Sequence, residues 1–299
     1  MRVLVVGGTG AIGRPLVTAL TERGHEVAAL TRDPGHADML SSLSAQAVVV
    51  DVLDRDATAT AILEVRPEIV VDQLTALPRN YTPETMRASL GATTAVRTTG
   101  GDNVYVAGVA AGARRYVAQS GCYYYRPGVG LAAEAEPWVE DGPPLVAGGV
   151  EALAAVEKRT LNGPMAGVAL RYGFFYGPGT WFHPDGDVAE QVRASQYPVS
   201  GSGAGRWSFV HIDDAVAATV AAIESEITGV FNVCGDSPVP LGEWLPAFAR
   251  YVGAPPPPHV PIGPSSDPDG RFYAELLRGA DNQLARRQLG FTPRPLPWL

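Results

Sequence analysis

The chain has 299 residues, of which 46% are hydrophobic and 18% charged, and its formal net charge is -8. This is typical of a globular chain and excludes a disordered one. The negative charge argues against a nucleic-acid or anionic-membrane surface, because both need clustered Lys and Arg. The two cysteines, Cys122 and Cys234, lie outside any CxxC or Cys/His spacing, so neither a disulfide framework nor a metal site is predicted.

No uninterrupted apolar run approaches about 18 residues, so no membrane span is expected. The opening MRVLVVGG reaches its glycines too soon to be a signal peptide. We therefore expect a cytoplasmic protein.

Apolar segments alternate with segments of helical spacing over the first 172 residues. The predicted strands are residues 2–6, 26–30, 47–50, 68–72, 115–119 and 167–171, and the predicted helices are residues 13–23, 54–65, 100–113 and 149–161. This alternation predicts an α/β fold with a doubly wound parallel sheet of the Rossmann type. Residues 1–172 are expected to form this dinucleotide-binding domain. Residues 173–299 are expected to form a smaller C-terminal α/β substrate lobe, partly interleaved with the first domain.

The strongest motif is VLVVGGTGAIGRPL, where the first predicted strand gives way to a helix. Gly7, Gly10 and Gly13 fit G-x-x-G-x-x-G, and Gly8 with the last two also fits G-x-G-x-x-G. Such glycines let the backbone approach a pyrophosphate, with amides and the helix N-terminus facing the anion. A tight strand–helix turn without a ligand is the alternative.

The end of the second predicted strand bears on the choice between NADP and NAD. A guanidinium at Arg32, beside Thr31, suits a ribose 2′-phosphate, which favours NADP(H). If Arg32 only points into solvent, Asp33 favours NAD(H) as the alternative cofactor. Asp51, directly after the third strand, either accepts from the adenine amino group or caps the next helix. The other predicted cofactor contacts are Thr9, Ala11, Ile12, Val52, Gln73, Leu74, Thr75, Ser120, Tyr172 and Phe174.

Four further segments resemble the extended short-chain dehydrogenase/reductases, also called the NAD-dependent epimerase/dehydratase family. They are ARRYVAQS at 113–120, LRYGFFYGPG at 170–179, FVHIDD at 209–214 and LGFTP at 289–293. The resemblance covers most of the chain. It implies a nicotinamide cofactor and an active site of Asn, Ser or Thr, Tyr and Lys, the last two spaced as Y-x-x-x-K. In that arrangement the Tyr transfers a proton, and the Lys lowers its pKa and holds the ribose.

The sequence departs from this pattern at three of the four catalytic positions. Arg97 stands where the family has Asn, Gly149 where it has Tyr and Leu153 where it has Lys, whereas Ser120 is kept. One hypothesis is a catalytically silent cofactor binder. The other is a reductase whose proton comes from water, from Ser120, from one of Tyr123–Tyr125 or from the substrate. Ser120 and Tyr124 are the predicted catalytic residues.

Several side chains suggest an apolar, aromatic substrate. The predicted substrate-binding residues are Tyr123, Tyr125, Trp181, His183, Arg206 and Trp207. Aromatic rings stack on planar ligands, but each of these rings can equally belong to the core. His183 suits a surface or structural role as well as acid–base work. Arg206 can bind an acidic substrate group or be a solvated loop residue.

An intact glycine loop without the Tyr–Lys pair resembles the atypical ketoreductases of actinobacterial antibiotic pathways. The resemblance implies an NADP(H)-dependent ketoreductase for a hydrophobic aromatic ketone of the polyketide or angucyclinone type. An NAD-dependent sugar-nucleotide epimerase/dehydratase and a non-catalytic NADP(H)-sensing module are the alternatives. The chain is expected to be a monomer or a homodimer.

Overall fold

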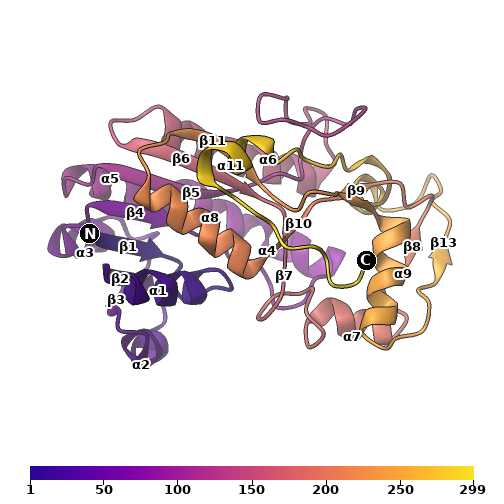
Figure 1. The fold of residues 1–299 in the computed structure, drawn as a ribbon, viewed down its shortest axis with the longest axis horizontal. Helices are drawn as coiled ribbons and strands as arrows, with labels where there is room; N and C mark the ends of the chain where they lie inside the picture. Colours follow the sequence, from indigo (N-terminus) through magenta and orange to yellow (C-terminus); the bar gives the residue numbers. More distant parts are fainter.

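A computed structural model describes all 299 residues and contains one central sheet of seven parallel strands (Figure 1). Across the sheet the order is β3 (Gln46–Val49), β2 (Glu26–Thr31), β1 (Arg2–Val6), β4 (Ile69–Asp72), β5 (Arg115–Gly121), β6 (Ala166–Tyr172) and β11 (Gly229–Val233). The order in which strands are added reverses between β1 and β4: β2 and β3 extend the sheet on one side of β1, and β4 begins its extension on the other side. In doubly wound folds, ligands bind at the carboxyl ends of the strands at such a switch point. The predicted fold class is confirmed.

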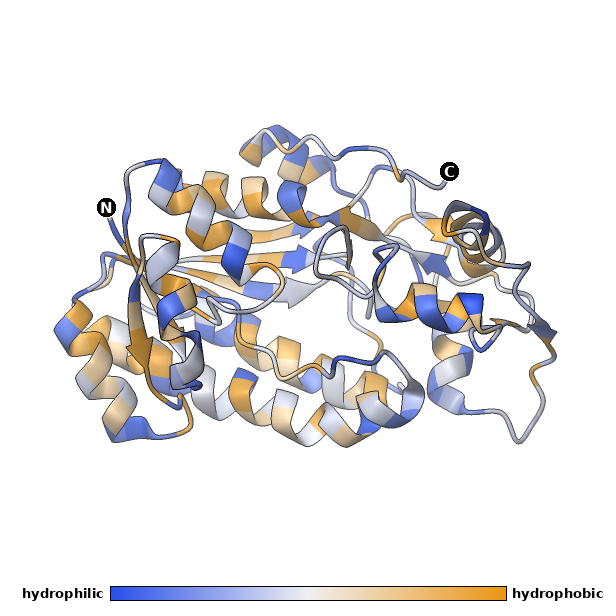
Figure 2. Cartoon of the chain, turned by 90° about the horizontal axis from the view of Figure 1, so that it is seen from below, coloured by the Kyte–Doolittle hydropathy of each residue, from blue (hydrophilic) through white to orange (hydrophobic).

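Helices cover both faces of this sheet, as Figure 2 shows. They are α1 (Gly13–Glu22), α2 (Ala37–Ser42), α3 (Arg55–Val65), α4 (Pro83–Ala95), α5 (Gly101–Ala110), α6 (Pro144–Leu161), α8 (Ile212–Glu224) and α11 (Gln283–Leu289). In β1, Val3 and Val5 pack in the core shared with α1 and α8, which lie against each other. Leu4 and Val6 pack in the core shared with α3, α5 and α6. Because successive strand residues point to opposite faces, a sheet covered on both sides is apolar throughout.

The predicted helix 100–113 does not begin at residue 100. Helix α4 runs through a π turn at Val96–Gly100 into α5, so one continuous helical path extends from Pro83 to Ala110. The prediction began this helix at Gly100 and placed no helix directly before it. Gly101 gives room to the Arg159 guanidinium, which a Cβ there would overlap. The start of α4 carries a reciprocal Thr82–Thr85 cap, a sequence signal that the prediction overlooked.

The residues after 172 are divided between the sheet and a second lobe. Strand β11 joins the Rossmann sheet, and helices α8 and α11 pack against it. The lobe contains α7 (Asp187–Arg193), α9 (Leu241–Tyr251), α10 (Pro268–Arg271), a π turn at Phe272–Leu276 and three strand pairs. The pairs are β7 (Phe174–Tyr176) with β10 (Phe209–His211), β8 (Val199–Ser200) with β13 (His259–Val260), and β9 (Arg206–Trp207) with β12 (Val239–Pro240).

The lobe is held by an aromatic cluster. Trp207 and Trp244 are almost fully buried and lie 5.2 Å apart between ring centroids, with Phe182 against both. The exact boundary between the two domains stays a prediction. None of the helices combines the length and the apolar character needed to cross a membrane.

Candidate active site

The glycine loop follows β1 and packs tightly on the start of α1. Gly7 has φ +81°, and a Cβ on it would lie 2.7 Å from the Gln73 carbonyl oxygen. A Cβ on Gly13 would overlap the Gly7 carbonyl and lie 2.8 Å from Gly8. No side chain caps the start of helix α1, where the Arg14 amide donates to the Gly10 carbonyl at 3.2 Å. This cradle fits the pyrophosphate of a dinucleotide.

At the end of β2, Arg32 is exposed and forms no ion pair, whereas the Asp33 carboxylate is engaged locally. Asp33 Oδ1 accepts from the Gly35 amide at 2.9 Å. Thr31 is buried beside them. The free guanidinium and the occupied carboxylate favour a 2′-phosphate over a ribose hydroxyl. The preference for NADP stays a prediction.

Asp51 does not cap the next helix, because Asp54 is the N-cap of α3 and accepts from the Asp56 and Ala57 amides. The Asp51 Oδ1 instead accepts from the Leu53 amide at 3.0 Å, and its contact with adenine stays a prediction. The Val52 carbonyl accepts from the Asn103 side chain at 2.9 Å. Leu74 donates its amide to Asp72 Oδ1. These positions lie outside the walls of the main cavity, as do Gly7, Thr31 and Arg32.

The main cavity has a volume of 1310 Å³ and extends from the glycine loop into the second lobe. The predicted cofactor residues in its walls are Thr9, Gly10, Ala11, Ile12, Gln73, Thr75, Ser120, Tyr172 and Phe174. Gln73 Oε1 is buried without a hydrogen-bond partner, while its Nε2 faces the Tyr172 hydroxyl at 3.4 Å. An unsatisfied acceptor in the cavity wall is a further position at which a bound cofactor finds a partner.

Four of the six predicted substrate residues line the same cavity: Tyr123, Trp181, His183 and Trp207. Trp181 is fixed by its Nε1, which donates to the Arg79 carbonyl at 2.9 Å. His183 Nδ1 accepts from the Asp185 amide at 3.2 Å, which is a structural use of that nitrogen. Tyr81, Tyr197 and Tyr273 complete the aromatic wall.

Tyr125 and Arg206, the other two predicted substrate residues, do not line this cavity. Tyr125 is 1% exposed and stacks on Trp138 with an interplanar angle of 9°. Its hydroxyl donates to Asn232 Oδ1 at 2.7 Å, so the residue belongs to a buried polar network. Arg206 is exposed, and its NH1 donates to the Pro238 carbonyl at 3.2 Å, on a different part of the surface.

Tyr124 lines the cavity and lies against Gly149 of α6. A Cβ on Gly149 would lie 2.7 Å from the Tyr124 hydroxyl oxygen. That hydroxyl shares a hydrogen bond of 2.9 Å with the Tyr273 hydroxyl. Burial raises the pKa of Tyr124 and holds the pKa of Tyr273 well above its usual range. Leu153, one turn along α6, is fully buried in the same apolar cluster.

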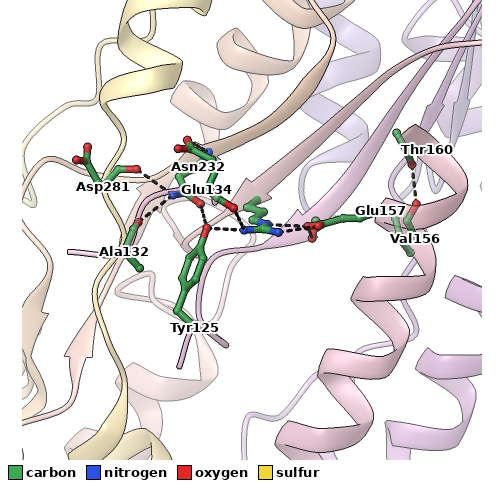
Figure 3. Close-up of polar contacts among 10 residues, drawn as sticks. Tyr125, Ala132, Glu134, Val156, Glu157, Thr160, Asn232 and Asp281 are labelled. Atoms are coloured by element: carbon green, nitrogen blue, oxygen red, sulfur yellow. Dashed lines mark hydrogen bonds and ion pairs between the residues drawn. The ribbon is translucent and has the colours of Figure 1, made fainter. Parts of the chain in front are cut away.

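Ser120 is buried and donates to Glu157 Oε1 at 2.6 Å. Glu157 is also paired with Arg171 through two hydrogen bonds of 2.7 Å. Arg171 NH1 donates in turn to the Tyr125 hydroxyl, which continues the network to Asn232 (Figure 3). The Ser120 hydroxyl donates its proton to a carboxylate. Toward the cavity it can therefore accept a hydrogen bond but not donate one.

Arg97, in the π turn at Val96–Gly100, is 7% exposed and lines the cavity. Its charge acts on Tyr123 and Tyr124, whose pKa values burial raises and the guanidinium partly lowers. Sequence reasoning treated Arg97 only as a lost Asn. A lone cation between small and apolar residues was the available signal. Tyr273 lies in the second π turn, and nothing in the sequence singled it out. π turns are rare and frequent at functional sites.

Comparison with known proteins places this geometry among nicotinamide-dependent enzymes. A family model described as the NAD dependent epimerase/dehydratase family matches residues 3–234. The 3-diazoavenalumate denitrifying reductase of a Streptomyces species is 45% identical over 305 residues, covering 100% of this chain and 98% of that protein. The 2'-dehydrokanamycin reductase of Streptomyces kanamyceticus is 26% identical over 293 residues, covering 94% and 73%. The UDP-glucose 4-epimerase of Thermus thermophilus, solved with NAD, is 25% identical with a TM-score of 0.74, covering 100% and 96%.

Proposed function

The chain belongs to the NAD dependent epimerase/dehydratase family and is an NAD(P)-dependent oxidoreductase, and we propose that it reduces a planar aromatic small molecule of a natural-product pathway. The observation that carries the proposal is a single cavity that joins the glycine loop to a wall of aromatic side chains. Tyr123 and Phe174 stack with centroids 5.0 Å apart, and Tyr81 lies 4.7 Å from Trp181. Such rings favour a flat, apolar ligand.

The absence of the Tyr–Lys pair restricts which group of the substrate can accept the hydride. Lys158 is the single lysine of the chain, and it is exposed outside the cavity. No lysine therefore lowers the pKa of a cavity tyrosine, and burial raises the pKa of Tyr124. A buried phenol of raised pKa is a poor proton donor. The site thus favours a reaction in which hydride transfer needs no accompanying proton.

An aryl diazonium group meets this requirement. Bound NAD(P)H supplies a hydride, which a ketone accepts together with a proton, whereas an aryl diazonium accepts the hydride alone, forms a C–H bond and releases N2. The 45% identical relative supports this choice, because its name describes a denitrifying reductase of a diazo compound. We infer that the residues here bind and orient such a substrate: Ser120 accepts a hydrogen bond, and the aromatic wall excludes water.

A ketone is the second candidate, and the position of Tyr124 favours it. The Tyr124 hydroxyl occupies the space over Gly149, where the family's proton-transferring side chain begins, and Tyr273 holds it at 2.9 Å. In this alternative, Tyr124 or a phenol of the substrate gives the proton. The substrate is then an aromatic polyketide ketone, which is the class that the resemblance to atypical ketoreductases of antibiotic pathways implies, and NADPH is the preferred reductant.

The test compares an aryl diazonium with a ketone of the same ring system. Purified protein is incubated with each compound and with NADPH or NADH that carries deuterium at the transferable position. The expected result is deuterium on the ring carbon that lost nitrogen, at a rate well above that without protein. Deuterium only in an alcohol establishes the ketone alternative, and loss of that reaction in Tyr124→Phe assigns the proton to Tyr124 rather than to the substrate. Cofactor binding without transfer to either compound overturns both.

A further inference from the structure

Arg97 is a buried cation without a counter-ion in the wall of the proposed substrate cavity. It is 7% exposed, its Nε has no hydrogen-bond partner, and it takes part in none of the ion pairs of the protein. Its backbone is fixed, because the Arg97 carbonyl accepts from Arg159 NH2 at 2.9 Å. The side chain is therefore held at the cavity by a braced π turn.

The carboxylates of the cavity wall are engaged elsewhere. Asp187 accepts from Asn80 and from the Tyr81 amide, and Asp269 accepts from the Leu145 and Val146 amides at the start of α6.

The two remaining acidic residues of the wall are also accounted for. Asp267 pairs with Arg87 at 3.0 Å. Asp185 is exposed and lies beside His183 at 3.6 Å. None of the four carboxylates neutralises Arg97.

A buried charge without a partner costs free energy, and folded proteins pair such charges or use them for ligands. We propose that Arg97 binds a carboxylate of the substrate, so that the substrate class is an acidic planar aromatic compound. This inference rests on the proposed function and specifies its substrate. Arg206, which the sequence suggested for an acidic group, lies outside the cavity, and Arg97 takes that role.

The neighbours of Arg97 fit this role. Tyr123 and Tyr124 lie close enough for the guanidinium to lower their pKa values against burial, so the charge faces the aromatic end of the cavity. A guanidinium presents paired N–H donors that match the two oxygens of a carboxylate. A ring stacked along Tyr123 and a carboxylate on Arg97 together fix both the plane and the direction of a flat substrate.

The experiment measures binding to the full protein saturated with NADP⁺. The probes are 2-naphthoate and 2-naphthamide, which share a shape and differ in charge, and affinity is measured by calorimetry. We expect the native protein to bind the carboxylate at least tenfold more tightly than the amide. Arg97→Gln is expected to erase that margin, and Arg97→Lys to restore part of it.

Arg79→Gln is the matched control, because Arg79 is an exposed cation of the same cavity and its removal changes the net charge equally. It is expected to retain the tenfold preference. Thermal unfolding of Arg97→Gln is expected at a temperature no lower than that of the native protein, since the variant removes an unpaired buried charge.

Three results would overturn the inference. They are a native protein that binds both probes alike or neither, an unchanged margin in Arg97→Gln, and an equal loss of margin in Arg79→Gln. Weaker NADP⁺ binding in Arg97→Gln, measured in a separate titration, would assign the cation to the cofactor instead. Failure of the proposed function is distinct, since it appears as absent hydride transfer while the carboxylate preference persists.

Discussion

The ring of Tyr124 rests against the backbone of Gly149, so that the hydroxyl oxygen would lie 2.7 Å from a Cβ on that glycine. Tyr124 comes from the loop after β5, and Gly149 comes from α6. The family resemblance described above aligns Gly149 with the proton-transferring Tyr of the family. An aromatic ring from another segment therefore fills the space that a side chain at residue 149 would need.

Replacing Gly149 with Ala tests this packing. The added methyl group meets the Tyr124 ring, and overpacking of a core costs about 1–3 kcal/mol of the free energy of unfolding. Displacement of Tyr124 is also expected to lower turnover at least tenfold. Denaturant unfolding and the rate of NAD(P)H oxidation measure the two effects.

Gly91→Ala is the control, because Gly91 lies inside α4 with open space around its Cα. Ala is a better helix former, so this variant is expected to be about 0.5–1 kcal/mol more stable. Equal stability of the two variants would contradict the close contact of Tyr124 and Gly149.

The pH dependence of turnover tests whether a tyrosine of the cavity titrates. Burial raises the pKa of Tyr124, and the Tyr273 hydroxyl and Arg97 only partly lower it. A phenol loses its proton as pH rises through its pKa, so a raised pKa moves that loss to higher pH. We expect no tyrosine-dependent fall in kcat between pH about 7 and about 10. A fall in that range that disappears in Tyr124→Phe would show that a low-pKa Tyr124 acts as the acid.

The glycine loop and the doubly wound parallel sheet could be predicted because their causes are local. Gly7 needs a positive φ, and Gly13 lies so close to the Gly7 carbonyl that no side chain fits there. The alternation of apolar strands with helices specifies a parallel sheet covered on both faces. These constraints depend on the spacing of residues that are close in the sequence, so the sequence alone indicates them.

The roles of the three consecutive tyrosines could not be predicted in this way. Tyr123 and Tyr124 line the cavity, whereas Tyr125 points into a network that depends on Asn232, over 100 residues away in the chain. The direction of each ring depends on partners from β11 and from the second lobe. Arg97 was overlooked for a similar reason, since only the folded chain shows that no carboxylate pairs with it.

Cofactor preference is expected to depend on Arg32. The native protein should bind NADPH at least tenfold more tightly than NADH, which corresponds to about 1.4 kcal/mol. Arg32→Ala should remove that margin by weakening NADPH binding alone, because only NADPH carries the 2′-phosphate that we expect the guanidinium to bind. Calorimetric titration with both cofactors measures the change. Arg287→Ala, which removes an exposed cation from α11, should leave the margin intact. A preference for NADH in the native protein would instead favour a ribose contact by Asp33.

The Glu157–Arg171 pair is expected to hold the active site together rather than to take part in the chemistry. Both residues are buried, and Arg171 also supports the Tyr125 hydroxyl. Arg171→Met leaves Glu157 without its cation, and breaking a buried pair costs about 3–5 kcal/mol of the free energy of unfolding. The double variant Glu157→Leu with Arg171→Met removes both charges and should recover much of that loss.

Ser120→Ala tests whether Ser120 only contributes to stability through Glu157 or also takes part in the reaction. The Ser120 proton goes to Glu157, which keeps both bonds to Arg171 in the variant, so the loss of stability should be only about 1 kcal/mol. Turnover should fall less than tenfold, because the hydroxyl does not donate to the substrate. Denaturant unfolding of the single and double variants, with kcat measured for Ser120→Ala, checks both statements. A loss of turnover of a hundredfold or more with native stability would mean that Ser120 turns from Glu157 and donates to the reacting group.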